Sequence, residues 1–157
     1  MTDDDIRAPH LRKQDFLGAF AVVRRAGAIL MVQNRRSIGG REVRTWDLPG
    51  GQVEPGELLE EALARELEEE THLVVRGPTP FLFVQEGARV RRGRRVHAWR
   101  SFFFAVDAFE GEPRAGAEIL AVRWFPYADL DGVLTAPYHA CFRNWLATGG
   151  SYFRTTW

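Results

Sequence analysis

The chain has 157 residues, of which 45% are apolar and 27% charged, a composition typical of a globular protein with a sizeable core. Its 21 basic residues balance 21 acidic ones, which excludes the overall positive charge common among nucleic-acid-binding domains. The single cysteine, Cys141, excludes an internal disulfide and favours a reducing, cytoplasmic location. The longest run without a polar residue, 16–23, is too short to span a membrane, and the acidic start does not resemble a signal peptide.

The first half of the chain is dominated by short apolar runs. Two of them, 16–23 and 28–32, flank a glycine-containing turn and predict a β-hairpin. Residues 1–15 are polar and are interpreted as a loose lead-in, and the glycine- and arginine-rich segment 34–45 as a loop. A short extended piece at 46–51 ends in a Pro-Gly-Gly turn.

The clearest predicted element is a helix over 57–71, because this segment follows Pro55-Gly56 and consists almost entirely of helix formers. Further strands are predicted at 73–75, 81–85, 98–107 and 119–125. A turn or short helix at 126–130 and a helix at 137–147 follow. The aromatic segment 152–157 is expected to pack back on the body. Mostly strands with two separate helices predict one α+β domain over 1–157.

The predicted helix carries three glutamates on one face. At about 100° per residue, Glu66, Glu69 and Glu70 project from one side, beside the helix's own apolar stripe. Like charges at this spacing repel one another unless a cation lies between them. Carboxylate oxygens suit Mg²⁺ or Mn²⁺, so the pattern points to a divalent-metal site, and the alternative is a solvated acidic face.

The residues before and along this helix resemble the Nudix family. The family signature is Gly, five residues, Glu, seven residues, then Arg-Glu-aliphatic-any-Glu-Glu-any-Gly-aliphatic, and eight of its nine specified positions match between Gly51 and Leu73. The exception is His72, where the family has glycine. We interpret His72 as a left-handed helix cap, since histidine tolerates that conformation better than most residues and Mg²⁺ prefers oxygen ligands. Flanking segments extend the likeness over 16–147.

The resemblance implies an α/β/α sandwich with a mixed β-sheet. It also implies an enzyme that hydrolyses the pyrophosphate bond of a nucleoside di- or triphosphate derivative by attack of water. The implied cofactor is Mg²⁺ or Mn²⁺. The implied ligands are the carboxylates of Glu66, Glu69 and Glu70 and the backbone carbonyl of Gly51.

The resemblance also suggests which residues assist the reaction. Arg65 is expected to orient a neighbouring carboxylate such as that of Glu66, rather than to form an exposed pair. The general base differs among Nudix enzymes. It is a glutamate of the signature, here Glu66 or Glu69, or one on a later loop, for which Glu118 is the candidate, as base or as additional metal ligand.

Substrate recognition is less specified by the sequence. Arg35, Arg36, Arg41 and Arg44 are candidates for binding phosphate, although one or two at most are expected to touch a ligand. Trp46 is a candidate for stacking a base, with core packing as its alternative. The arginine cluster at 89–95 is compatible with a terminal phosphate or an RNA backbone but is more typical of a solvated hairpin tip. Segment 88–91 lacks the proline or tyrosine of two Nudix subfamilies, so we expect a nucleoside triphosphate or a general nucleoside diphosphate derivative.

Two alternatives of a different kind stay open. A Nudix-fold module that binds nucleotide without turnover would share these residues, although the intact glutamate set argues against it. An isoprenoid diphosphate isomerase on the same fold would need a cysteine in its site, and Cys141 is expected in the core of the C-terminal helix. Many relatives are dimers, so a homodimer is expected by analogy alone.

Overall fold

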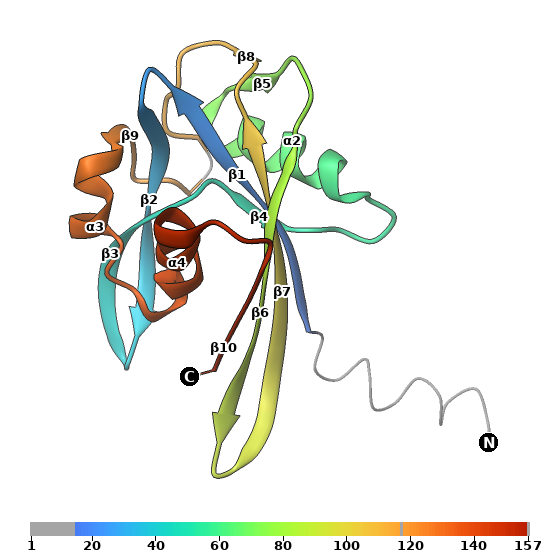
Figure 1. The fold of residues 1–157 in the computed structure, drawn as a ribbon, viewed down its shortest axis with the longest axis vertical. Coiled ribbons are helices and arrows are strands. Elements are labelled where there is room, and N and C mark those ends of the chain that lie inside the picture. The colour runs from blue at the N-terminus through green and yellow to red at the C-terminus, as the bar shows by residue number, and fades with distance from the viewer. Residues whose placement is uncertain (1–14, 117, 157) are drawn as a thin grey trace.

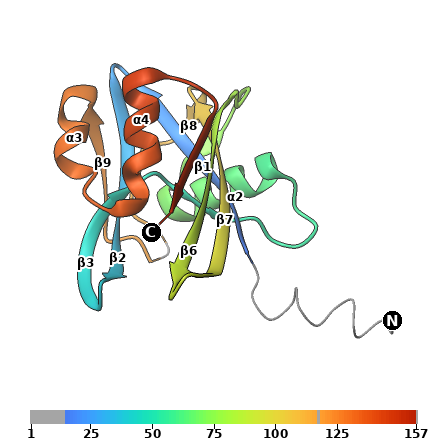
Figure 2. The same cartoon turned by 60° about the horizontal axis from the view of Figure 1, so that its bottom comes forward.

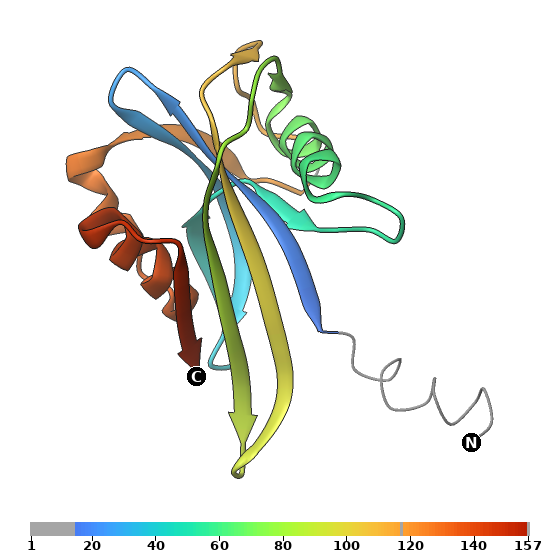
Figure 3. The same cartoon turned by 45° about the vertical axis from the view of Figure 1, so that its right-hand side comes forward.

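The computed structural model describes residues 15–116 and 118–156, so the lead-in predicted for 1–15 lies, except for Asp15, outside the described residues. A mixed β-sheet forms the middle layer. The helix of the signature covers one face and the C-terminal helices cover the other (Figures 1 and 3). This is the α+β, three-layer arrangement that the resemblance implies.

The described residues form ten strands and five helical segments. The strands are β1 (Phe16–Arg25), β2 (Ala28–Ile38), β3 (Arg41–Asp47), β4 (Gly50–Gln52), β5 (Val74–Val75), β6 (Phe81–Arg91), β7 (Arg94–Val106), β8 (Phe109–Glu110), β9 (Ala121–Pro126) and β10 (Tyr152–Thr156). The helices are α2 (Leu59–Thr71), α3 (Leu130–Val133) and α4 (Ala140–Thr148), with 3₁₀ turns η1 (Tyr127–Asp129) and η2 (Pro137–His139).

The main sheet runs in the order β10-β6-β7-β1-β2-β3, with β4 also paired to β1 and β9 to β2. The pairs β1–β7 and β10–β6 are parallel, and the others are antiparallel. Strand β1 therefore lies at the centre, and its side chains alternate between the two faces. It contributes Ala19, Ala21 and Val23 to the core beneath α2, and Val22 to the core beneath α3 and α4.

Helix α2 begins two residues later than predicted, after Leu58, whose backbone N–H donates to Glu61 Oε1 at 2.8 Å. Its buried stripe, Ala62, Leu63, Leu67 and Thr71, packs against the sheet. The helix ends at His72, which has φ 62° and ψ 11° and whose N–H donates to the Glu68 carbonyl. The left-handed cap predicted for His72 is therefore the conformation that the chain adopts.

The loop predicted over 34–45 is wrong. Strand β2 continues to Ile38 and β3 begins at Arg41, and the turn is only Gly39-Gly40, both with positive φ. The arginines that suggested a loop lie on an exposed hairpin, where Arg35 pairs with Glu42 across the strands. Charged side chains are compatible with strands where the sheet faces solvent.

The hairpin β6–β7 is longer than its two predicted strands. Both strands extend past the predicted ends to an Arg92-Gly93 turn with positive φ at both positions, as tight hairpins require. The hairpin reaches well beyond the rest of the sheet (Figures 1 and 3). The predicted arginine-rich tip at 89–95 is therefore confirmed as the end of a β-ribbon.

The C-terminal part covers the face opposite α2 (Figures 2 and 3). The helix predicted at 137–147 begins as η2 and continues as α4, and the following segment packs back as β10, parallel to β6, as expected. The helices of the described residues are all too short or too polar to cross a bilayer.

Candidate functional site

Two glycines at the start of β4 bring the backbone against two glutamates of α2. A Cβ atom at Gly51 would lie only 2.7 Å from the carboxylate of Glu66, so only glycine permits this approach. The backbone N–H of Gly50 donates to Glu70 Oε2 at 3.2 Å. The signature glycines therefore place two carboxylates at one end of β4.

Arg65 ties the acidic residues together. Its guanidinium makes a bidentate pair with Glu57, with both N–O distances 2.8 Å. Its Nη1 also donates to Glu66 Oε1 at 3.0 Å and to Glu69 Oε2 at 3.3 Å, and its Nη2 donates to the Gln52 carbonyl. Hydrogen bonds from Arg65 and from the Glu54 backbone lower the pKa of Glu57 to about 2. The bidentate partner of Arg65 is thus Glu57, whereas Glu66 receives a single bond.

The carboxylates of this cluster outnumber the positive charges beside them. Burial raises the pKa of Glu66, although Arg65 opposes the shift. Burial raises the pKa of Glu70 to about 8, and the negative charge of Glu66 adds to the effect while the Gly50 N–H opposes it. One guanidinium faces several carboxylates here, and a hard divalent cation would supply the missing charge. Carboxylate oxygens are a donor set that fits Mg²⁺ or Mn²⁺.

Glu69 is the most accessible of the three predicted ligands, with a side chain that is 53% exposed. Throughout 15–116 and 118–156, no three acidic, histidine or cysteine side chains converge closely enough to surround one ion. Arg65 draws Glu66 and Glu69 toward itself, while Glu70 turns to Gly50. Ligation by all three would require the exposed Glu69 side chain to rotate away from Arg65.

The loop that carries Glu118 is attached to the end of α2. The backbone N–H groups of Arg114 and Gly116 donate to the carbonyls of Thr71 and Glu70 at 3.1 and 2.9 Å. Glu118 follows two residues later and is exposed. The fold therefore brings this predicted base to the acidic helix from a distant part of the sequence.

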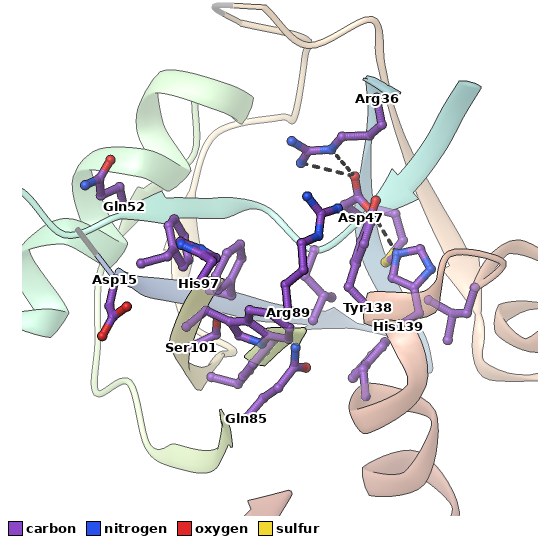
Figure 4. A pocket seen from close by; sticks show the side chains of 18 residues that line it. Asp15, Arg36, Asp47, Gln52, Gln85, Arg89, His97, Ser101, Tyr138 and His139 are labelled. Atoms are coloured by element: carbon purple, nitrogen blue, oxygen red, sulfur yellow. Dashed lines mark hydrogen bonds and ion pairs between the residues drawn. The ribbon is translucent and has the colours of Figure 1, made fainter. Parts of the chain in front are cut away.

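A cavity of about 590 Å³ lies on the other side of the sheet, between the strands and the C-terminal helical segment. Gln52 marks one end of the cavity and the Asp47–His139 pair the other (Figure 4). Because Gln52 also accepts a hydrogen bond from Arg65, one end of the cavity adjoins the acidic cluster. A molecule in the cavity can therefore extend a charged group toward β4 and α2.

A buried polar network around Asp47 closes the far end of the cavity. Asp47 Oδ1 accepts from Tyr138 at 2.8 Å and from His139 Nε2 at 2.7 Å, and Oδ2 accepts from Thr45 at 2.8 Å and Asn34 at 2.9 Å. His139 Nδ1 accepts from a backbone N–H, so its Nε2 carries the proton. Burial alone would raise the pKa of Asp47, but these hydrogen bonds outweigh it and lower the pKa to about 2.

Four of the five residues predicted to bind substrate lie outside the lining of this cavity, and Arg36 is part of it. Arg35 forms an ion pair with Glu42 at 3.1 Å, and Arg44 lies opposite it in the β2–β3 register. Trp46 packs edge-on against Phe125, with ring centroids 5.0 Å apart. Their binding roles stay predictions. Sequence reasoning did not single out three other residues of the lining, Asp47, Tyr138 and His139.

Cys141 lies in α4 and is 2% exposed, and its thiol does not line the cavity. Burial raises the pKa of the thiol. The core position expected for this cysteine is confirmed. Its thiol is therefore not placed at the cavity, where a cysteine-dependent isomerase would need it.

Comparisons with known proteins agree with this architecture. A family model described as a NUDIX domain matches residues 15–147. The 8-oxo-dGDP phosphatase NUDT18 of Mus musculus is 34% identical over 113 residues, which are 69% of this chain and 31% of that protein. A putative 8-oxo-dGTP diphosphatase of Bacillus subtilis is 44% identical over 54 residues, 34% of this chain and 33% of that protein. The chain thus spans about a third of the length of these curated relatives.

Solved structures share the fold over nearly the whole chain. A MutT protein from Bacillus halodurans has a TM-score of 0.75 at 22% identity and covers 90% of each chain. A MutT NUDIX hydrolase from Burkholderia pseudomallei has a TM-score of 0.65 at 28% identity, covering 86% of this chain and 98% of that one. With the signature on β4 and α2 and a family match over most of its length, the chain belongs to the Nudix family.

Proposed function

We propose that the chain is a divalent-cation-dependent hydrolase that cleaves the pyrophosphate bond of a nucleoside di- or triphosphate derivative by attack of water. The observation that carries the proposal is the position of the Gly51–Glu66–Glu70 cluster beside one end of a cavity large enough for a nucleoside. Two of the relatives are named for oxidised guanine nucleotides, which belong to the same substrate class.

Hard oxygen atoms are available to hold Mg²⁺ or Mn²⁺ at this cluster. The ligands would be carboxylate oxygens of Glu66, Glu69 and Glu70 and the carbonyl oxygen of Gly51, with Glu118 as a further one. When bound, such cations neutralise pyrophosphate oxygens and lower the pKa of the attacking water. Burial raises the pKa of Glu70 in the free protein to about 8, and a bound cation would favour its ionised form.

The side chains around the cluster position reactants and accept the proton. Glu57 fixes the guanidinium of Arg65, which in turn holds Glu66 Oε1. The proton of the attacking water passes to a carboxylate oxygen of Glu69 or Glu118, both of which are exposed. The negatively charged phosphates lie near β4, while the nucleoside occupies the cavity.

Three further expectations accompany this proposal. The free, buried thiol of Cys141 supports the cytoplasmic location proposed from the sequence. A homodimer stays a prediction, and contact of the 89–95 arginines with RNA stays the less favoured alternative to a solvated hairpin tip.

Hydrolysis of a nucleotide panel with Mg²⁺ and with Mn²⁺ tests the proposal. The variants are Glu69→Gln, Glu70→Gln and Glu118→Gln, and Glu68→Gln is the matched control because Glu68 is an exposed glutamate of the same helix. We expect Glu70→Gln to lose most of the activity. The change at whichever of Glu69 and Glu118 acts as the base should lower kcat about 10²- to 10⁴-fold. The Glu68→Gln protein should have the kcat of the wild type.

The outcomes separate the alternatives. Hydrolysis that none of the three changes affects would place the chemistry elsewhere in the molecule. Nucleotide binding without turnover under any cation would identify a binding module instead of an enzyme.

A further inference from the structure

A second, smaller hollow lies on the face of the sheet opposite the large cavity. It has a volume of about 170 Å³ and is formed by β6, β7 and β10, which lie side by side at the end of the sheet away from β3 (Figure 1). Glu86 and Arg100 line the hollow, whereas their neighbours along the same strands, Gln85 and Ser101, line the large cavity. Successive side chains of a strand point to opposite faces, so the sheet separates the hollow from the cavity.

The strand register explains how the hollow forms. Three charged residues are aligned in one row across β10, β6 and β7: Arg154, Glu86 and Arg100. Two residues nearer the end of the β6–β7 hairpin, the next row on the same face consists of Thr156, Ala88 and Ala98. The two alanines leave space above the strands, and Arg95 lines the hollow from the side of the hairpin end. Guanidinium groups therefore border the hollow on two sides.

The carboxylate in the hollow is already engaged. Glu86 Oε1 accepts from Arg100 at 3.0 Å, and its Oε2 accepts from the Tyr152 hydroxyl at 2.6 Å. The hydrogen bond from Tyr152 and the charges of Arg100 and Arg154 lower the pKa of Glu86. Asp15, which does not line the hollow, lies 3.9 Å from Arg100. The nearby negative charge is therefore directed mainly at Arg100.

The other two arginines of the hollow, Arg95 and Arg154, are exposed, and neither forms an ion pair with any residue that the structure describes. A guanidinium group makes charge-assisted, often bidentate hydrogen bonds to phosphate oxygens. The volume of the hollow is less than a third of that of the large cavity, so it suits a small oxyanion and not a whole nucleotide.

We infer that the hollow binds a phosphate-bearing anion of the size of inorganic phosphate or pyrophosphate. The guanidinium groups of Arg95 and Arg154 and the hydroxyl of Thr156 would donate to its oxygens, and Arg100, held by Glu86, would add positive charge. The proposed hydrolysis releases an anion of this class, so the chain would carry a binding site for a product outside its hydrolytic centre. The binding itself does not depend on hydrolysis.

Isothermal titration calorimetry of the full chain with sodium pyrophosphate, after removal of divalent cations on a chelating resin, tests the inference. Without cations the carboxylates of the α2 cluster outnumber the positive charges beside them and repel the anion, so the heat reports on other sites. We expect one pyrophosphate per chain in about 0.15 M salt, where charges more than about 8 Å apart are largely screened. Titrations with a nucleoside monophosphate identify the source of the phosphate group. Tighter binding of pyrophosphate indicates the free anion, and tighter binding of the monophosphate indicates a nucleotide.

A pair of charge variants separates the hollow from the rest of the hairpin. The double change Arg95→Gln and Arg154→Gln should weaken pyrophosphate binding about 10-fold or more, because it removes two charged donors. The matched control is the double change Arg91→Gln and Arg92→Gln, which removes the same charge from exposed arginines outside the lining. The control should change the affinity less than about 2-fold.

A third variant tests the shape of the hollow and leaves every charge in place. Ala98→Leu would fill the space above the strands and should weaken binding as much as the loss of the two arginines. Ala128→Leu, at an exposed alanine outside the lining, is its control and should bind as the wild type does. Thermal unfolding of each variant without ligand shows whether the fold is retained, and the arginine variants decide the question if Ala98→Leu unfolds early.

Several outcomes would overturn the inference. These are a wild-type protein that does not bind pyrophosphate, an affinity that the change of Arg95 and Arg154 leaves intact, and equal losses in the two arginine pairs. Single-stranded DNA that binds more tightly than pyrophosphate, and that both arginine pairs weaken equally, would identify a nucleic-acid surface along the hairpin instead. The proposed function fails separately, if the protein does not hydrolyse nucleotides with Mg²⁺ or Mn²⁺, because these titrations contain no divalent cation.

Discussion

Replacing Asp47 by Asn should destabilise the protein at neutral pH by an amount that the local hydrogen bonds set. The carboxylate accepts hydrogen bonds from Asn34, Thr45, Tyr138 and His139 and is almost completely buried. Its pKa falls from 3.8 to about 2, because hydrogen bonds outweigh the effect of burial. That difference corresponds to roughly 2.5 kcal/mol of stability. The amide N–H₂ would replace one carboxylate oxygen, each of which accepts from at least two donors, so we expect about 3 kcal/mol in total.

The pH dependence has a definite sign. A carboxyl group whose pKa is lowered by folding stabilises the folded state above its unfolded pKa, near 3.8, and this contribution is lost as the pH falls through about 2. The difference in free energy of unfolding between wild type and Asp47→Asn should therefore be constant from about pH 5 to pH 8 and shrink below about pH 4.

Urea denaturation followed by circular dichroism at a series of pH values measures this difference. Asp131→Asn is the control: Asp131 pairs with Arg143 at 2.7 Å, but its side chain is 83% exposed, so the change should cost less than about 1 kcal/mol. An Asp47→Asn protein as stable as the wild type at pH 7, or a difference that grows on acidification, would refute the reasoning.

Three other predictions concern the acidic cluster. Millimolar Mg²⁺ or Mn²⁺ should raise the melting temperature of the wild type, and the triple change of Glu66, Glu69 and Glu70 to Gln should abolish that rise. Without cation, the triple variant should be equally or more stable than the wild type at pH 7, because ionisation of the buried Glu70 opposes folding. An unchanged cation response would contradict the ligand assignment. Gly51→Ala should remove most cation-stimulated hydrolysis in a kinetic assay, since the Cβ of the new alanine would contact the Glu66 carboxylate. A fully active variant would show that the close approach of the residue 51 backbone to Glu66 is not needed. Arg65→Lys should lower kcat and destabilise the fold by about 1 to 2 kcal/mol in urea unfolding, since Lys cannot make the bidentate pair with Glu57. A kcat equal to that of the wild type would exclude a positioning role for Arg65.

The sequence specified the parts of the fold that depend on local pattern. The helix over 57–71 follows from its composition, and the left-handed cap at His72 from its place in the signature. The hairpin at 28–47 could not be predicted in this way. Its exposed arginines lie in strands because β2 and β3 pair with each other, as at Arg35 and Arg44. The buried start of β2 pairs in turn with the distant β9, as at Leu30 and Trp124.

The glutamate cluster and the cavity differ in how far the sequence reveals them. The glutamates of α2 are within one helix, so their spacing reveals them. Gln85, Ser101 and Asp47 become neighbours of one cavity only because three strands and a C-terminal turn meet there, and none of them belongs to a periodic pattern. The substrate residues predicted from proximity in sequence, Arg35 and Arg44, lie on the exposed hairpin β2–β3 for the same reason.

The central position of β1 has a consequence for how the protein can diversify. Its odd-numbered side chains, Ala19, Ala21 and Val23, support the helix that carries the carboxylates, while Phe16 and Phe20 form part of the cavity floor. Altered specificity can therefore arise from substitutions on one side of a single strand while the proposed hydrolytic centre on the other side keeps its support. An insertion or deletion within this strand would shift both sets at once, which makes it the segment of the chain least tolerant of changes in length.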